Sequence, residues 1–468
     1  MKNYTCFFIV VAVLLYSCND SEQQPSPPAP KLLASSPANN AENIPAGDLT
    51  VTLTFDQNVI CPAAEQPKIT ISNGAQITQI AYNSGAPTAQ IFVSGLDFNQ
   101  NYTLNIPANV IQTPAKTGAE AISLNFKTKE QVVISGLVTE HPSPEAVALF
   151  DYLRQIYGHK ILSATVATVN WNTNEAQWVF EHTGKYPAIN VFDYIHLYAS
   201  PANWIDYGDI SVVENWHNAG GIVGTMWHWN VPKSETAAAG EVTYRPEETT
   251  FRTSNSTVSG TWENTVVNAD LEKIANYLLL LKNKNIPVIW RPLHEAAGNI
   301  YAYPASGAWF WWGNDGAEAY KNLWKYMFNY LKNKGLNNLI WVFTTQTDNA
   351  TSASDLPFYP GDEYVDIVGR DSYNNQNPAS LFAEFSVMEQ NFSQKMLTLA
   401  ECGNIAPISD QLNAGAKWLW FMPWYDYART NNPASAAFQE TSHEHCDVNY
   451  WNAAWADERV LSRDKINY

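Results

Sequence analysis

Two glutamates follow apolar, strand-like runs and could act as a pair of catalytic acids. Glu295 ends the segment WRPLHE (290–295) after the apolar run 286–289, and Glu401 directly follows the apolar run 396–400. Apolar, β-branched residues that run into a carboxylate are typical of a buried strand with an acid at its C-terminal end. Two such carboxylates are the minimum for retaining glycoside hydrolysis, in which one protonates the leaving oxygen and the other attacks from about 5–5.5 Å away.

A parallel barrel is the element that would bring these two glutamates together. From about residue 136, apolar strands alternate with helical stretches such as Ala269–Lys284 and Ala317–Lys334, which is typical of βα units. The predicted strands are Lys160–Ala164, Tyr186–Val191, Ile222–Trp227, Val288–Arg291, Leu339–Thr344, Val365–Gly369, Met396–Ala400 and Trp418–Met422. Eight strands over roughly 300 residues predict an α/β fold, a (β/α)8 TIM barrel over 136–468, with catalytic groups at the strand C-termini.

Polar and aromatic residues close five of these strands, the third, fourth, sixth, seventh and eighth. They are His228, Glu295, Asp371 with Tyr373, Glu401 and Trp424. Because the C-terminal ends of barrel strands face one side of the barrel, we expect these residues to surround one pocket.

This half of the chain, about 136–460, resembles glycoside hydrolase family 26 in the retaining clan A, whose best-known members are endo-β-1,4-mannanases. The resemblance is carried by five pieces in order: Trp227-His228-Trp229-Asn230, Arg291-Pro292-Leu293-His294-Glu295, Trp309-Phe310-Trp311-Trp312-Gly313, Asp371-Ser372-Tyr373 and Ala400-Glu401-Cys402-Gly403. Most barrel relatives in the clan carry Asn before the acid, and His294 at this position matches family 26.

The resemblance implies that Glu295 is the acid/base and Glu401 the nucleophile, with the Tyr373 hydroxyl orienting Glu401. For either glutamate the alternative is a structural ion pair with an arginine. The two carboxyl groups would need pKa values that differ, so that one begins protonated and the other ionised.

The same resemblance implies sugar contacts. His228 would touch the sugar at the cleavage point, Trp424 would lie beneath it, and Trp309 would support the leaving side. His294 either hydrogen-bonds near the acid/base or substrate, or supports the site from behind. Asp371 is either part of a polar network or a simple rim residue.

The loop before Trp309 is lengthened by residues 299–308, which departs from the family pattern and puts the position of Trp309 in question. Trp311 and Trp312 are expected to pack in the core. A second long connection, Pro232–Glu263, follows the third predicted strand and would decide between an open cleft and a closed end.

The function expected from these features is a retaining endo-β-1,4-mannanase that acts on mannan, glucomannan or galactomannan. Alternatives within the family are a β-1,3-xylanase, a mixed-linkage β-glucanase and an exo-enzyme that releases mannobiose. An alternative of another class is a non-catalytic, glycan-binding surface lipoprotein, against which the presence of both Glu295 and Glu401 argues.

The first 31 residues predict export and lipid anchoring. Residues 1–17 combine an early lysine with a short apolar run, as a signal peptide does, and LLYSC (14–18) resembles a bacterial lipobox that ends at Cys18. Acylation of Cys18 would anchor the chain in the membrane, and the proline-rich stretch 18–31 would be a tether. We expect an outer-membrane lipoprotein exposed at the cell surface; the periplasmic face and secretion are the alternatives.

Residues 32–130 consist of short alternating runs separated by Asn, Gly and Pro, for example Leu49–Phe55 and Tyr102–Ile106. Such spacing predicts a small antiparallel β-sandwich, and the segment resembles bacterial Ig-like modules. These modules usually serve as spacers, and glycan binding is the alternative.

The amino-acid composition narrows the classes of ligand and partner that the chain could bind. With 27 basic and 45 acidic residues the net charge is −18, which argues against binding nucleic acid through a basic surface and suits a neutral partner. The 18 Trp and 24 Tyr residues fit carbohydrate binding as well as a filled core. Outside the leader, Cys61, Cys402 and Cys446 permit one disulfide at most and show no metal-ligand spacing. We therefore expect a monomer without metal or cofactor.

Overall fold

The computed structural model describes residues 28–129, 136–169, 171–298, 307–345 and 356–468. The predicted leader, Cys18, most of the tether and residues 299–306 of the lengthened loop lie outside this part. Within it, no helix has both the length and the apolar character needed to cross a membrane. Internal contacts divide the chain into two units, Met1–Gln131 and Val132–Tyr468.

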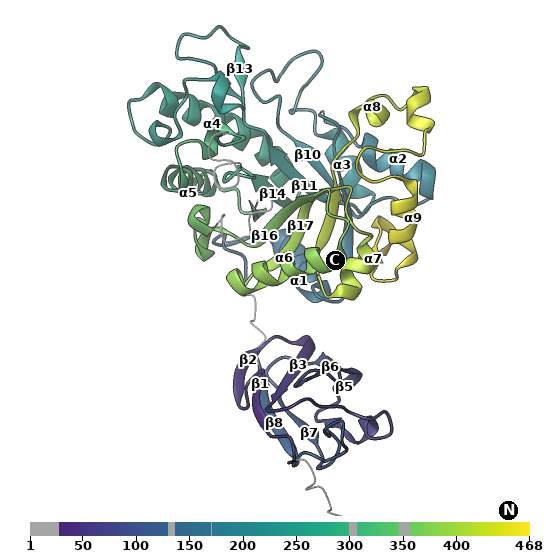
Figure 1. Cartoon of the computed structure of the whole chain (residues 1–468). Helices are drawn as coiled ribbons and strands as arrows, with labels where there is room; N and C mark the ends of the chain where they lie inside the picture. The colour runs from purple at the N-terminus through teal and green to yellow at the C-terminus, as the bar shows by residue number, and fades with distance from the viewer. Residues whose placement is uncertain (1–27, 130–135, 170, 299–306, 346–355) are drawn as a thin grey trace, which may run out of the picture. The chain divides into compact units, whose positions relative to one another are not determined.

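The second unit is built on a closed barrel of parallel strands, as predicted. Its eight strands are β9 (Ile161–Val166), β10 (Ile189–Asp193), β11 (Ile222–Trp227), β14 (Val288–Pro292), β15 (Leu339–Thr345), β16 (Ile367–Tyr373), β17 (Met396–Gly403) and β18 (Trp420–Pro423). They pair in this order, and β18 pairs with β9 to close the barrel. The short strand β19 (Val460–Leu461) also pairs with β9. Figure 1 shows the labelled strands at the centre of this unit with helices outside them.

The helices that alternate with these strands are α1 (Pro144–Ile156), α2 (Asn174–Thr183), α3 (Ser211–Asn218), α4 (Trp262–Asn283), α5 (Ala317–Asn333), α6 (Pro378–Asn391), α7 (Ile408–Ala414), α8 (Tyr427–Thr430) and α9 (Val448–Ala456). Helix α5 matches its predicted range closely. Helix α4 begins seven residues before its predicted start, because the Thr261 side chain accepts a hydrogen bond from the backbone N–H of Asn264 and caps the helix there.

Seven of the eight strands end later than predicted, and β9, β10, β16 and β17 do so by two to four residues. β10 continues to Asp193, β16 to Tyr373 and β17 to Gly403. Asp371, Tyr373 and Glu401 therefore lie within the last ladder positions, whereas His228, Glu295 and Trp424 follow the ends of their strands. The pairing of β16 with β17 also shifts by one residue between Arg370 and Asp371, which marks a β-bulge beside Glu401.

Two long connections at the active end are joined to each other. The β11–α4 connection holds a small hairpin of β12 (Val231–Pro232) and β13 (Val242–Thr243), then the 3-10 turns η2 (Pro246–Glu248) and η3 (Thr253–Asn255). The β14–α5 connection ends with the 3-10 turn η4 (Trp311–Gly313). The Trp311 indole N–H donates to the backbone oxygen of Trp229 at 2.7 Å, and the Thr253 hydroxyl donates to the backbone oxygen of Trp311 at 2.5 Å.

The first unit is an Ig-like sandwich of mostly antiparallel strands, as predicted. One sheet has the order β1 (Leu32–Ser36), β3 (Gly47–Phe55), β6 (Thr88–Leu96), β5 (Gln76–Tyr82), and the other β2 (Ala41–Ile44), β8 (Ile122–Thr128), β7 (Asn101–Ile106), β4 (Thr70–Ile71). Alternate residues of β3, β6 and β7, such as Val51, Ile91 and Leu104, are buried between the sheets. This alternation is the pattern from which the sandwich was predicted.

Candidate active site

A cavity of about 880 Å³ opens at the C-terminal ends of the barrel strands. It is lined by His228, Tyr244, Arg245, Glu247, His294, Glu295, Ala308, Trp309, Phe310, Tyr373, Glu401 and Trp424. The structure therefore brings together seven of the eight barrel residues predicted for the site. The eighth, Asp371, is fully buried and lies behind the cavity wall.

Glu295 sits in a tight turn directly after β14. Both Leu293 and Glu295 have positive φ angles, 48° and 50°, a conformation that costs free energy in residues other than glycine. The carbonyl groups of this turn are held from outside: the Tyr320 hydroxyl donates to the Leu293 oxygen, and the Trp312 indole N–H donates to the His294 oxygen. The chain thus uses α5 and η4 to fix the backbone from which the Glu295 carboxyl projects.

Gly313 allows η4 to approach this turn. A Cβ atom at residue 313 would lie 1.9 Å from the backbone oxygen of Ala296, so only glycine fits. The Trp-Trp-Gly segment is therefore a packing element, and Trp311 and Trp312 are fully buried, as predicted.

Glu401 is held on both of its carboxylate oxygens. The β-bulge lies directly before it in β17, and bulges of this kind redirect a side chain. Arg291 Nη1 donates to Oε1 at 2.6 Å, and the Tyr373 hydroxyl donates to Oε2 at 3.0 Å. Burial, followed by the Glu401 charge, raises the pKa of Tyr373 well above its usual range, so this hydroxyl keeps its proton. Glu401 is thereby fixed in one orientation.

Arg291 is the central cation of the site. Its Nη2 donates to Asp371 Oδ2 at 2.6 Å and its Nε donates to the Thr344 hydroxyl at 2.9 Å, in addition to the bond to Glu401. Burial alone would lower the pKa of Arg291, but the Asp371 and Glu401 carboxylates outweigh it and raise the pKa. One guanidinium thus bridges two carboxylates with a planar fork, which is the geometry that arginine provides and lysine does not.

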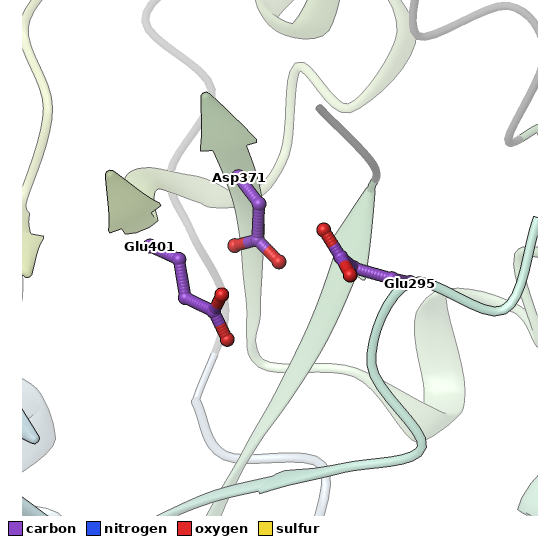
Figure 2. A group of neighbouring side chains, drawn as sticks. All are labelled: Glu295, Asp371 and Glu401. Atoms are coloured by element: carbon purple, nitrogen blue, oxygen red, sulfur yellow. The ribbon is translucent and has the colours of Figure 1, made fainter. Parts of the chain in front are cut away.

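The three carboxyl groups face a common centre, as Figure 2 shows for Glu295, Asp371 and Glu401. One oxygen from each lies within 4.8 Å of the others. Burial, and then the negative charges of Asp371 and Glu401, raise the pKa of Glu295 well above its usual range. Asp371 Oδ1 is buried and has no hydrogen-bond partner among the described residues; a proton on the neighbouring Glu295 carboxyl would supply one. The arrangement favours a proton on Glu295.

Such a carboxyl cluster could hold a metal ion in principle. Here the Arg291 guanidinium already bonds to Asp371 and Glu401. Two of the three carboxyl groups are therefore paired with a cation from the chain itself. The ion pair between Glu401 and Arg291 also shows that pairing with an arginine, considered above as an alternative to catalysis, coexists with exposure of Glu401 to the cavity.

Two histidines form the wall beside the acid. The ring Nδ1 of His228 lies 2.6 Å from Asp193 Oδ2, and its backbone N–H donates to Asp193 Oδ1 at 3.1 Å, so Nε2 is left for the cavity. The His294 ring lies 4.6 Å from the His228 ring. Burial, with Arg291 and His228 adding to it, lowers the pKa of His294 well below its usual range. A neutral His294 can donate or accept a hydrogen bond.

Aromatic side chains complete the wall. The Trp424 ring lies 5.9 Å from the His228 ring, and its backbone N–H donates to the Cys402 oxygen at 2.9 Å, which ties it to the strand of the nucleophile candidate. Trp309 is half-buried and lines the same cavity. Sugar rings present apolar C–H faces that pack against such aromatic surfaces.

Sequence reasoning missed several residues of the site. Asp193 ends β10, but the predicted strand stopped two residues earlier, so the rule that found the other strand ends did not reach it. Arg291 was quoted within a motif but received no role, although a charged residue inside an apolar strand was a usable signal. Tyr244, Arg245 and Glu247 come from the β11–α4 connection, and nothing local in the sequence indicates that they enter the cavity.

Comparison with known proteins agrees with this geometry. The model of glycosyl hydrolase family 26 matches residues 138–448, and that of a bacterial Ig-like domain matches residues 27–128. A mannan endo-1,4-β-mannosidase of Thermothelomyces thermophilus is 32% identical over 376 residues, 75% of this chain and 72% of the relative. Mannan endo-1,4-β-mannosidase B of Piromyces sp is 31% identical over 62% of this chain and 48% of the relative, so the chain spans about half of that protein.

Among solved structures, the family 26 domain of an endo-β-mannanase/endo-β-glucanase from Prevotella bryantii superposes with a TM-score of 0.65 at 41% sequence identity. The superposition covers 71% of this chain and 99% of the Prevotella bryantii domain. Residues 138–448, which the family model matches, contain all eight barrel strands and both glutamates. The chain therefore belongs to glycosyl hydrolase family 26 and carries a bacterial Ig-like domain before its catalytic barrel.

Proposed function

We propose that the chain is a retaining endo-β-1,4-mannanase. The observation that carries the proposal is the Glu295–Glu401 pair, with one oxygen from each carboxyl within 4.8 Å of the other. Retaining glycosidases place the two groups about 5–5.5 Å apart, whereas inverting enzymes need about 6.5–9.5 Å to admit a water between them. The short separation supports direct attack by one carboxylate on the sugar.

In this mechanism Glu295 donates its proton to the glycosidic oxygen while Glu401 attacks the anomeric carbon. The raised pKa of Glu295 supports its role as the acid, because a raised pKa favours the protonated form of the carboxyl. Arg291 and Tyr373 hold Glu401 in the attacking orientation. In the second step a water attacks the glycosyl-enzyme, and Glu295, now ionised, accepts the proton from that water.

The remaining wall residues would position the sugar at the cleavage point. His228 presents Nε2, neutral His294 offers a hydrogen bond, and Trp424 offers a flat apolar surface, with Trp309 on the leaving side. Asp371 would act through Glu295 and Arg291 and not on the substrate. The names of the mannan endo-1,4-β-mannosidase relatives support mannan as the substrate. Glucomannan and galactomannan are the further substrates that we propose.

We further propose that acylated Cys18 anchors the enzyme in the outer membrane, with the Ig-like domain as a spacer between lipid and barrel. The lipobox-like segment 14–18 supports the anchor. A surface location would place the catalytic barrel next to a polymer too large to enter the cell.

The test of the function is the release of reducing ends by the purified chain from galactomannan, glucomannan, β-1,3-xylan and mixed-linkage β-glucan, with the products sized. We expect mixed oligosaccharides from the mannans. Release of disaccharide alone would indicate an exo-enzyme, and activity confined to xylan or glucan would replace the substrate while keeping the mechanism. Binding without cleavage of any of the four would reject the enzyme assignment.

A further inference from the structure

The β11–α4 connection brings three side chains into the catalytic cavity that have no place in the mechanism above. Tyr244, Arg245 and Glu247 lie between the end of β13 and the end of η2, and they line the same cavity as Glu295 and Glu401. Their position there depends on how this long connection is anchored to the barrel.

The backbone of this segment is fixed by contacts with the neighbouring connection. The Trp311 backbone N–H donates to the Tyr244 oxygen at 3.0 Å, and the Arg245 backbone N–H donates to the Thr243 hydroxyl at 3.0 Å. The Tyr244 ring lies 5.7 Å from the His228 ring and 5.8 Å from the Phe310 ring. The Tyr244 ring thus packs against the residues that line the proposed cleavage point. The backbone of Arg245 is fixed by its hydrogen bond to Thr243.

Arg245 is held near the cavity without being neutralised by a strong partner. Its guanidinium carbon lies 5.9 Å from the centre of the Tyr244 ring, and a hydrogen bond with Tyr244 is the main cause that raises the pKa of Arg245. Its ion pair with Glu248 is long, 3.9 Å, and its side chain is 56% exposed. Exposed pairs of this kind contribute little, so a ligand can replace the contact.

The carboxylates that act on Arg245 are Glu248 and Glu247, whereas those that act on Arg291 are Asp371, Glu401 and Glu295. The two arginines therefore interact with different carboxylates. Arg291 belongs to the catalytic centre, and Arg245 lines the cavity from the β11–α4 connection. A guanidinium offers five N–H donors in a planar fork, and a carboxylate beside it offers acceptors. Together they match the adjacent hydroxyl groups of a neutral sugar ring.

We infer that Arg245, supported by Tyr244 and with Glu247 beside it, forms an additional sugar subsite for units that do not flank the cleaved bond. The inference rests on the proposed glycosidase function and names part of its binding site. The ligand is a pyranose unit of the same polymer with free neighbouring hydroxyls. The subsite would increase the affinity for long chains and favour cleavage inside them.

The experiment measures kcat and KM of Arg245→Ala over a series of oligosaccharides of increasing length, using the full chain. We expect kcat/KM to fall about 10-fold for the long members, mainly through KM, because hydrogen bonds to a charged group are lost. The shortest oligosaccharide that the enzyme cleaves should be unaffected. For the long oligosaccharides, the kcat/KM of Arg245→Lys, which keeps the charge without the planar fork, should lie between those of the wild type and Arg245→Ala.

Arg252→Ala is the matched control. Arg252 belongs to the same connection, is 55% exposed and pairs with Asp315 at 3.4 Å, but it does not line the cavity. It should leave all lengths unchanged. An equal loss of kcat/KM for every length in Arg245→Ala, or no loss at any length, would overturn the subsite. If the wild-type chain cleaves no mannan, the proposed substrate fails instead, and the length series is then run on the glycan that it does cleave.

Discussion

Replacing Arg291 with methionine tests the electrostatic organisation of the site. Arg291 is buried and bridges Asp371 and Glu401, with both N–O distances at 2.6 Å. Methionine fills similar space but leaves three carboxyl groups, including Glu295, within 4.8 Å of one another and without a cation. Arg291 acts to lower the pKa values of Glu295 and Asp371, so its loss raises both.

The magnitude follows from the contacts. A hydrogen bond to a charged group contributes about 1.5–3 kcal/mol. Loss of the bond that fixes Glu401 therefore corresponds to about a 10- to 150-fold fall in kcat/KM at the wild-type optimum. Removal of one partner from a buried ion pair also lowers the free energy of unfolding, by about 3–5 kcal/mol.

The assay is a pH–rate profile of kcat/KM together with thermal unfolding. Because a general acid works while protonated and the pKa of Glu295 rises in the variant, the high-pH limb of the profile should move toward higher pH. Arg370→Met is the control. Arg370 is also buried, its Nε faces Glu384 at 3.5 Å, and it acts weakly on the pKa of Asp371 but is not among the groups that shift the pKa of Glu295, so this variant should lose stability with a smaller change in the profile. An unchanged profile and rate in Arg291→Met would refute the reasoning.

Further predictions address the acid, the packing and the anchor. Glu295→Ala should lose most activity on polysaccharide but spare substrates with good leaving groups; equal losses on both would reject Glu295 as the acid. In the wild type, kcat/KM should fall as the pH rises through the raised pKa of Glu295, since the acid is then deprotonated. Gly313→Ala should reduce stability by about 1–3 kcal/mol in thermal unfolding, because its Cβ would overlap the Ala296 oxygen. Cys18→Ala should move the protein from the membrane fraction to the soluble fraction, and continued membrane association would exclude the lipid anchor.

The barrel could be predicted from sequence because its strands are short apolar runs with polar ends. The same rule located His228, Glu295, Glu401 and Trp424, since strand C-termini meet on one side of a barrel. At these positions the local pattern, a polar or aromatic residue directly after an apolar run, is enough to predict the location in the fold.

The remaining features depend on contacts between distant segments. The β-bulge before Glu401 arises from pairing between β16 and β17 and leaves no mark in the local pattern. From the sequence, Asp371 was either part of a polar network or a rim residue, and its burial and its bond to Arg291 on another strand place it in the network. Arg245 lines the cavity, and the backbone of its neighbour Tyr244 is bonded to Trp311 on a separate connection. Sequence spacing cannot supply such pairings.

The central claim is that Glu401 attacks the sugar and Glu295 supplies the proton. The most direct measurement is mass spectrometry of the enzyme after reaction with an activated 2-deoxy-2-fluoro glycoside, whose glycosyl-enzyme hydrolyses slowly, followed by peptide mapping. The account predicts one glycosyl group, attached to Glu401. A label on another residue, or no covalent species while the enzyme turns the compound over with inversion, would contradict it.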